Sequence, residues 1–259
     1  MVFLFKLLVT PILIGAVTLA GRRWGPIVSG LLMGLPLTSG PISFILAREN
    51  GLAFASHAAT GNLAGQVSVC IFCLVYSLVA QKSGWRVSVL ASIAAFIMVV
   101  AIWNQFSLQL LPVFIVSLIG ISLVSRLIPH HALSPHGSVH PNWDLPARMF
   151  LAASFVILLT PFSNLLGPQL SGLLSPFPIF GVVLAAFTHA QQGPKAASTL
   201  LRGVVLGSVS YAVFFLVVGI WLTGAGILWT YLIASLVAIV SSGIFYFITK
   251  KEVPSATRG

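Results

Sequence analysis

The chain contains an internal repeat, which opens as GPIVSGLLMGLP at residues 25–36 and returns as GPQLSGLLSPFP at residues 167–178. The correspondence runs without a gap over residues 25–77 and 167–219, where 17 of 53 positions are identical at a constant offset of 142. Further downstream, after a shift of one residue, LASIAAF corresponds to IASLVAI. The sequence therefore predicts two related halves.

Both halves are strongly apolar. Of the 259 residues, 58% are apolar and only 6% are charged, and the mean hydropathy is +1.07. About one-quarter of a soluble domain is charged, whereas apolar runs of about twenty residues are typical of helices that cross a bilayer. Because an isolated segment in lipid must satisfy its own backbone hydrogen bonds, each run is interpreted as a helix. The composition predicts an all-α integral membrane protein, with the lipid bilayer as its main partner.

The apolar runs predict about nine spans in a 4+1+4 arrangement. Residues 1–104 form repeat 1 with four spans, and residues 105–145 form a connector with one span and a histidine-rich loop. Residues 146–249 form repeat 2 with four spans, and residues 250–259 form a tail. The predicted spans are 3–20, 26–47, 53–80, 86–103, 107–127, 147–163, 168–189, 196–222 and 227–248.

The positive charges indicate an orientation. Of the thirteen Lys and Arg residues, eleven follow odd-numbered spans, and only Lys6 and Arg48 lie on the other side. The positive-inside rule then predicts an N-terminus outside and a C-terminus in the cytoplasm, and we expect the inner membrane of a bacterium. This distribution explains the net charge of +10 without a nucleic-acid partner. Nine spans also give the halves opposite orientations, which is the inverted repeat typical of secondary transporters.

The second span of each half is rich in Pro and Gly. Pro36 and Pro178 occupy equivalent repeat positions, about ten residues into their spans and therefore near the middle of the bilayer. Proline removes a helical hydrogen bond and clashes with the preceding turn, so we expect spans 2 and 7 to be broken helices. Their half-helix N-termini would form a partly positive binding region. The alternative is that the prolines only kink helices that pack closely.

The third span of each half combines small residues with buried amides. The pattern Gly-x-x-x-Gly-x-x-Ser occurs at 61/65/68 and again at 203/207/210, which predicts a close contact between helices. On another face of the first copy lie Asn62 and Gln66, one turn apart. These amides bind either a solute, together with Thr38 and Ser39 of the broken helix, or a neighbouring helix.

The eighth span carries Ser198 and Arg202, also one turn apart. It begins at Gly193-Pro194, a favourable helix start, which places Arg202 about 12 Å along the helix. Arg202 either reaches back to the cytoplasmic interface or closes the inner end of an anion pathway.

The sequence contains no catalytic motif such as HExxH, a Walker A loop or a dinucleotide-binding Gly motif. Cys70 and Cys73 form a C-x-x-C inside an apolar run, where small buried residues are the expected role. Four histidines between residues 130 and 140 match no closed metal site. They favour a solvated loop over a metal-binding or pH-responsive one. We therefore expect no enzymatic activity, no cofactor and no metal.

These features predict a multi-pass transporter of a small polar or anionic solute, with its site between spans 2 and 7. A homo-oligomer is compatible with this interpretation. The alternative is a non-transporting membrane subunit that assists export of an envelope lipid or glycan, in which the repeat is only a scaffold. The residues expected to bind the solute are Pro36, Thr38, Ser39, Asn62, Gln66, Pro178, Ser198 and Arg202.

Overall fold

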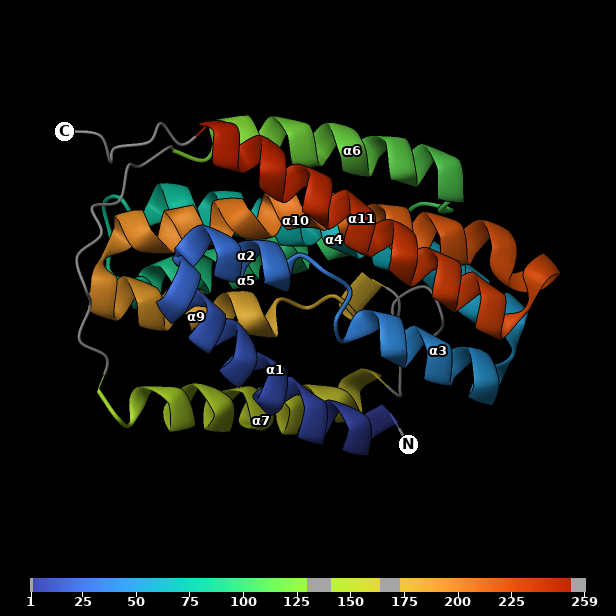
Figure 1. Ribbon diagram of the computed structural model, residues 1–259, viewed down its shortest axis with the longest axis horizontal. Helices are drawn as coiled ribbons and strands as arrows, with labels where there is room; N and C mark the ends of the chain where they lie inside the picture. Colours follow the sequence, from blue (N-terminus) through green and yellow to red (C-terminus); the bar gives the residue numbers. More distant parts are fainter. Residues whose placement is uncertain (1, 130–140, 164–172, 253–259) are drawn as a thin grey trace.

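The computed structural model describes residues 2–129, 141–163 and 173–252, and every regular element in these ranges is an α-helix (Figure 1). The predicted all-α class is therefore confirmed. The helices are α1 (Val2–Trp24), α2 (Pro26–Met33), α3 (Ser39–Asn50), α4 (Leu52–Val79), α5 (Trp85–Trp103), α6 (Leu110–Leu127), α7 (Asp144–Ser163), α9 (Ile179–Gln192), α10 (Pro194–Ala225) and α11 (Ile227–Glu252).

Six of the described helices, namely α1, α4, α5, α6, α10 and α11, are long and apolar enough to cross a membrane. In α5, α6 and α11 less than a third of the membrane-length segment is buried inside the molecule. Exposed apolar surface of that extent fits hydrocarbon better than water. The chain is a multi-pass integral membrane protein whose outer helices contact lipid.

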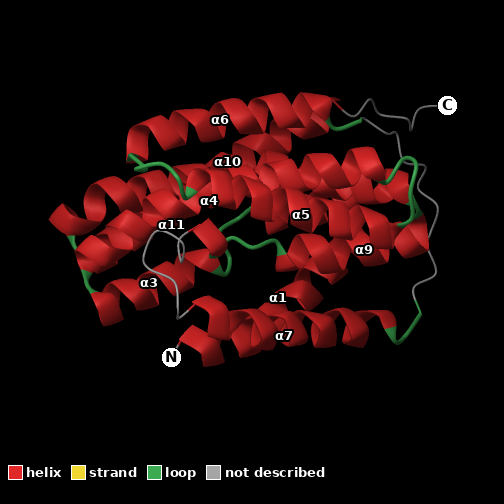
Figure 2. Ribbon diagram, turned by 180° about the vertical axis from the view of Figure 1, so that it is seen from behind, coloured by secondary structure: helices red, strands yellow, loops and turns green. Residues whose placement is uncertain are grey.

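Two long helices, α4 and α10, form the centre of the bundle. They span 28 and 32 residues, and most of each lies buried against neighbouring helices. Helices α5 and α6 pack against α4, while α11 and the short α2 pack against α10 (Figure 1). Helix α1 packs against α7 at the edge, as the view from behind also shows (Figure 2).

Single glycines join the short helices to the central ones. Gly51 separates α3 from α4 with φ 90°, and Gly193 separates α9 from α10 with φ 87°. Side chains other than glycine rarely adopt a positive φ without strain. These two glycines therefore allow the chain to reverse direction within one residue.

The predicted span 26–47 is divided between two helices, because α2 ends at Met33 and α3 begins at Ser39. Helix α2 lies directly on the backbone of α10. A methyl group on Gly34 would come within 2.5 Å of the Gly207 Cα. The glycine pattern of the third span in repeat 2 thus forms the close contact that it predicts.

Three parts of the sequence analysis lie outside the described residues. They are the histidine-rich loop at 130–140, the opening of the second repeat at 167–172, and the last residues of the tail from 253 onward.

Candidate functional site

The segment between α2 and α3 is held by several backbone hydrogen bonds, and three of them define its turn. Leu35 N donates to Leu32 O at 3.2 Å, and Leu37 N donates to Leu35 O at 2.8 Å. Gly40 N then donates to Pro36 O at 2.9 Å and begins the next helix. Together these bonds fix a compact turn in the middle of the predicted second span.

The segment that precedes α9 makes the same three bonds. Phe177 N donates to Leu174 O at 2.9 Å, and Ile179 N donates to Phe177 O at 2.8 Å. Val182 N donates to Pro178 O at 2.8 Å. Each donor and each acceptor is 142 residues beyond its counterpart in the first segment. The two turns therefore share one backbone design.

A proline occupies the centre of each turn. Pro178 has φ −79° and ψ 57°, which are close to the torsions of an inverse γ-turn. Proline suits this position because its ring fixes φ near −65° and it has no N–H to satisfy. Pro36 is half-buried and Pro178 is buried. Pro36 thus lies in a turn between α2 and α3, and Pro178 lies in the turn that precedes α9.

The first turn leads into a buried polar group at the centre of the bundle. Thr38 immediately precedes α3, and Ser39 is the first residue of α3. Ser39 is buried beside the hydroxyl of Tyr211 on α10. The Tyr211 hydroxyl donates to Asn62 Oδ1 at 2.9 Å, and Asn62 Nδ2 donates to Ala58 O at 2.9 Å. The structure therefore brings two of the predicted site residues, Ser39 and Asn62, to one tyrosine.

Gln66 bonds across the same helix crossing. Its Nε2 donates to Ser208 Oγ at 2.5 Å, and Ser208 donates to Val204 O at 2.8 Å. Gln66 and Ser208 are both almost fully buried, and they are equivalent positions of the repeat. The amides of Asn62 and Gln66 thus bond to side chains of α10, which was one of the two roles predicted for them.

Ser198 and Arg202 lie on α10, away from these central contacts. The Ser198 hydroxyl is buried and has no hydrogen-bond partner among the described residues. Arg202 Nε donates to Ser125 O near the end of α6 at 3.4 Å. Arg202 therefore links α10 to α6 at the end of the bundle that also carries Arg126.

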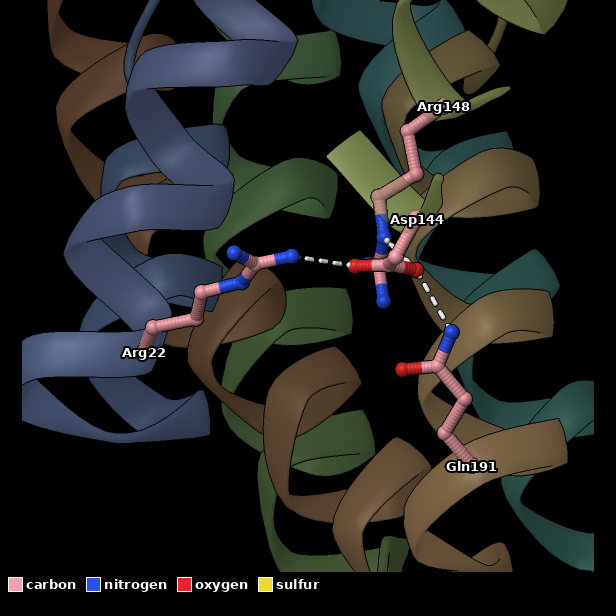
Figure 3. Close-up of polar contacts among 4 residues, drawn as sticks. All are labelled: Arg22, Asp144, Arg148 and Gln191. Atoms are coloured by element: carbon pink, nitrogen blue, oxygen red, sulfur yellow. Dashed lines mark hydrogen bonds and ion pairs between the residues drawn. The ribbon is translucent and has the colours of Figure 1, made fainter. Parts of the chain in front are cut away.

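A second polar cluster centres on Asp144, which sequence reasoning did not select as a site residue (Figure 3). Asp144 is fully buried at the start of α7. Its Oδ2 lies 2.7 Å from Arg22 Nη2, and its Oδ1 lies 2.9 Å from Arg148 Nε. Gln191 Nε2, at the end of α9, donates to Oδ1 as well. One carboxylate thus ties together the ends of α1, α7 and α9.

Asp144 is charged in this setting. Burial alone would raise the pKa of Asp144. Hydrogen bonds from Arg148, Arg22 and Gln191, together with the charge of Arg148, lower the pKa by more than burial raises it, so the net pKa lies below its ordinary value. Two sequence features could have indicated the cluster. The chain has only three acidic residues, and this one stands four residues before an arginine at the start of an apolar run.

A small pocket of about 30 Å³ adjoins this cluster. Two arginines, Arg22 and Arg148, belong both to the cluster and to the pocket wall. Arg148 also lies over the ring of Phe187, 4.9 Å from its centroid, a cation–π contact that helps to fix the guanidinium. The pocket is lined by Thr18, Gly21, Arg22, Pro26, Ser29, Arg148, Leu184, Thr188, Gln192 and Leu200.

The part of the chain that the structure describes holds no group of three potential metal ligands. Cys70 and Cys73 are buried free thiols on α4, as their apolar sequence context predicts. No family model, no curated protein and no solved structure matches the chain.

Proposed function

We propose that the protein is a secondary transporter of a small polar or anionic solute, built from two inverted repeats joined by α6. In this proposal α2 with α3, and the segment before α9 with α9, are two broken transmembrane helices. The solute binds between their turns. The N-terminus is outside and the C-terminus is cytoplasmic, because the cations then lie on the inner side.

Helix boundaries support the repeat. The starts of α4 and α10 lie at residues 52 and 194, and those of α5 and α11 at 85 and 227. Helices α3 and α9 end at 50 and 192. All three pairs differ by 142, which is the offset of the sequence repeat. These boundaries support a common order of helices in the two halves, with α6 as the connector.

Contacts between the halves support a two-fold relation. A methyl group on Gly207 would come within 2.5 Å of Leu31 O, and one on Gly65 would overlap Leu173 O. The second contact is the first with the halves exchanged. Gln66, moreover, bonds to its own repeat equivalent, Ser208, as residues close to a two-fold axis do.

The observation that carries the proposal is the identical three-bond turn in both halves. Non-helical backbone at membrane depth survives only where protein or a water-filled cavity covers it. Inverted repeats with interrupted helices are characteristic of transporters, whose substrates bind at the interruptions. Ser39, Asn62 and Gln66 are the polar groups that would meet a solute there, by exchanging their present partners.

Counterflow uptake into proteoliposomes tests the proposal. The panel contains labelled short carboxylates, phosphate, amino acids and polyols, and the variants are Pro36→Ala, Pro178→Ala and, as a control, Pro194→Ala. Pro194 is an exposed proline in the first turn of α10, away from both turns. We expect at least one solute to accumulate, and the first two variants to reduce its uptake strongly while Pro194→Ala preserves it. Equal uptake by all three variants would remove the turns from the site.

A second candidate is the non-transporting subunit, and one observation favours it. The amides of Asn62 and Gln66 already have partners on α10, which is what a rigid scaffold requires. If folded wild-type protein moves no member of the panel, the scaffold becomes the better function.

A further inference from the structure

The pocket beside Asp144 has a polar floor and a partly exposed rim. Thr18, Ser29, Thr188 and Arg148 are each at most 5% exposed, whereas Arg22 lies at the surface. A volume of about 30 Å³ exceeds the roughly 10–15 Å³ that one water molecule needs in a cavity. The pocket therefore admits a small polar group, while the rest of a larger molecule would stay at the rim.

The charges around this pocket do not cancel. Two guanidinium groups line it, and among the described side chains the carboxylate that faces both is Asp144. Each guanidinium has five N–H donors, and the bonds to Asp144 engage one donor of each arginine. Among the described groups at the pocket, one positive charge remains in excess. Helix α2 also begins at Pro26 in the pocket wall, and a helix N-terminus adds partial positive charge.

Thr18 provides an independent sign of a missing ligand. It lines the pocket, it is 5% exposed, and its hydroxyl has no hydrogen-bond partner among the described residues. A buried hydroxyl without a partner is costly, and native proteins rarely leave one unexplained. Thr18 stands one helical turn before Arg22, so the two side chains lie on the same face of α1.

We infer that this pocket binds an oxyanion group, a carboxylate or a phosphate, that carries one negative charge. Arg22 and Arg148 supply charged donors, and the hydroxyl of Thr18 supplies a neutral one. Such charge-assisted bonds are the strongest that protein side chains make to oxyanions. The group belongs either to a soluble anion or to the head of an anionic lipid at the membrane surface. This inference does not depend on transport.

Unfolding temperature in dodecyl maltoside micelles, which carry no phosphate, tests binding of soluble anions. Sodium phosphate or sodium acetate replaces sodium chloride at constant ionic strength. A second arm compares nanodiscs with and without phosphatidylglycerol. We expect the unfolding temperature of the wild type to rise with the oxyanion in one arm or both. A rise in micelles identifies a soluble anion, and a rise only with phosphatidylglycerol identifies a lipid head group.

Three variants separate binding from folding. Thr18→Val removes the unpaired hydroxyl at constant shape, so its unfolding temperature without oxyanion equals or exceeds that of the wild type, while the rise with oxyanion is lost. Arg22→Gln also loses the rise. Arg23→Gln keeps it, because Arg23 is outside the pocket wall and stacks on Trp24 at 5.5 Å. No rise in the wild type in either arm, or an equal rise in Thr18→Val and Arg22→Gln, would overturn the inference.

Discussion

The two polar regions of this protein differ in whether their groups have partners. At the crossing of α4 and α10, Asn62 bonds to Tyr211 and Gln66 bonds to Ser208, and all four side chains are uncharged. In the cluster around Asp144, by contrast, most of the groups are charged, and the hydroxyl of Thr18 in the adjoining pocket wall has no partner in the described structure. In a low-dielectric interior neutral paired groups are tolerated, whereas charges require compensation. Under the two proposals, a solute at the crossing would have to displace these partners, whereas an oxyanion in the pocket beside Asp144 would meet a hydroxyl that has no partner in the described structure.

Asp144→Asn tests the charged side of this comparison and should have the largest effect. Loss of the carboxylate charge leaves Arg148 buried without compensation, and breaking a buried ion pair typically costs about 3–5 kcal/mol. We expect a large fall in the unfolding temperature measured by scanning fluorimetry in detergent. Glu49→Gln is the matched control, because Glu49 is an exposed carboxylate at the end of α3 and exposed charges contribute little. Equal behaviour of the two variants would mean that the Asp144 cluster does not hold α1, α7 and α9 together.

Gly207→Ala tests the packing beneath the crossing. The new methyl group would lie 2.5 Å from Leu31 O, which belongs to a helix backbone and cannot move alone. Overpacking of this kind costs about 1–3 kcal/mol, so the unfolding temperature should fall. Gly243→Ala provides the control, since a methyl group there meets no described atom within 4 Å. Its helix should gain about 1 kcal/mol from propensity alone. A neutral Gly207→Ala would contradict the close approach of α2 to α10.

The sequence predicts the helices better than their partners. Apolar runs and the Gly and Pro positions are local signals, so the ends of α4 and α5 fall within a residue of the predicted spans 53–80 and 86–103. The turns are less predictable. Pro36 indicates an interruption, but the sequence does not distinguish a kinked helix from the compact turn that separates α2 and α3.

Long-range contacts were missed for a physical reason. Arg22 and Asp144 are 122 residues apart, and no local pattern states which helix ends meet. The bond between Gln66 and Ser208 differs, because these two residues are 142 positions apart, which is the offset of the sequence repeat. Under the proposed two-fold relation, residues near the axis contact their own equivalents, so the pair Gln66–Ser208 could have been proposed in advance. The partner of Asn62 could not, because Asn62 bonds to Tyr211, whereas its repeat equivalent is Val204.

Acidification neutralises the same carboxylate that Asp144→Asn removes, and we expect a smaller effect on stability. The pKa of Asp144 is lowered from its ordinary value of 3.8 in the folded protein. Its contribution to stability is therefore complete above that value and is lost as the pH falls through the lower, folded-state pKa. We expect the unfolding temperature of the wild type to fall more steeply below about pH 4 than that of Asp144→Asn. Parallel pH profiles would show that the ionised carboxylate adds nothing to stability.

The pair Gln66–Ser208 should give the smallest effect, and it tests the neutral side of the comparison. A double-mutant cycle with Gln66→Met, Ser208→Ala and the double variant measures the coupling energy of this one hydrogen bond. Since both groups are neutral, we expect about 0.5–1.5 kcal/mol. A coupling near zero would mean that the two side chains do not bond in the folded protein, and the comparison of neutral paired groups with the charged Asp144 cluster would then fail.

Uptake by the same variants separates the two candidate functions. If the pair exchanges partners with a solute, Ser208→Ala lowers uptake by more than its loss of stability explains. If the pair is only a scaffold, uptake follows the fraction of folded protein.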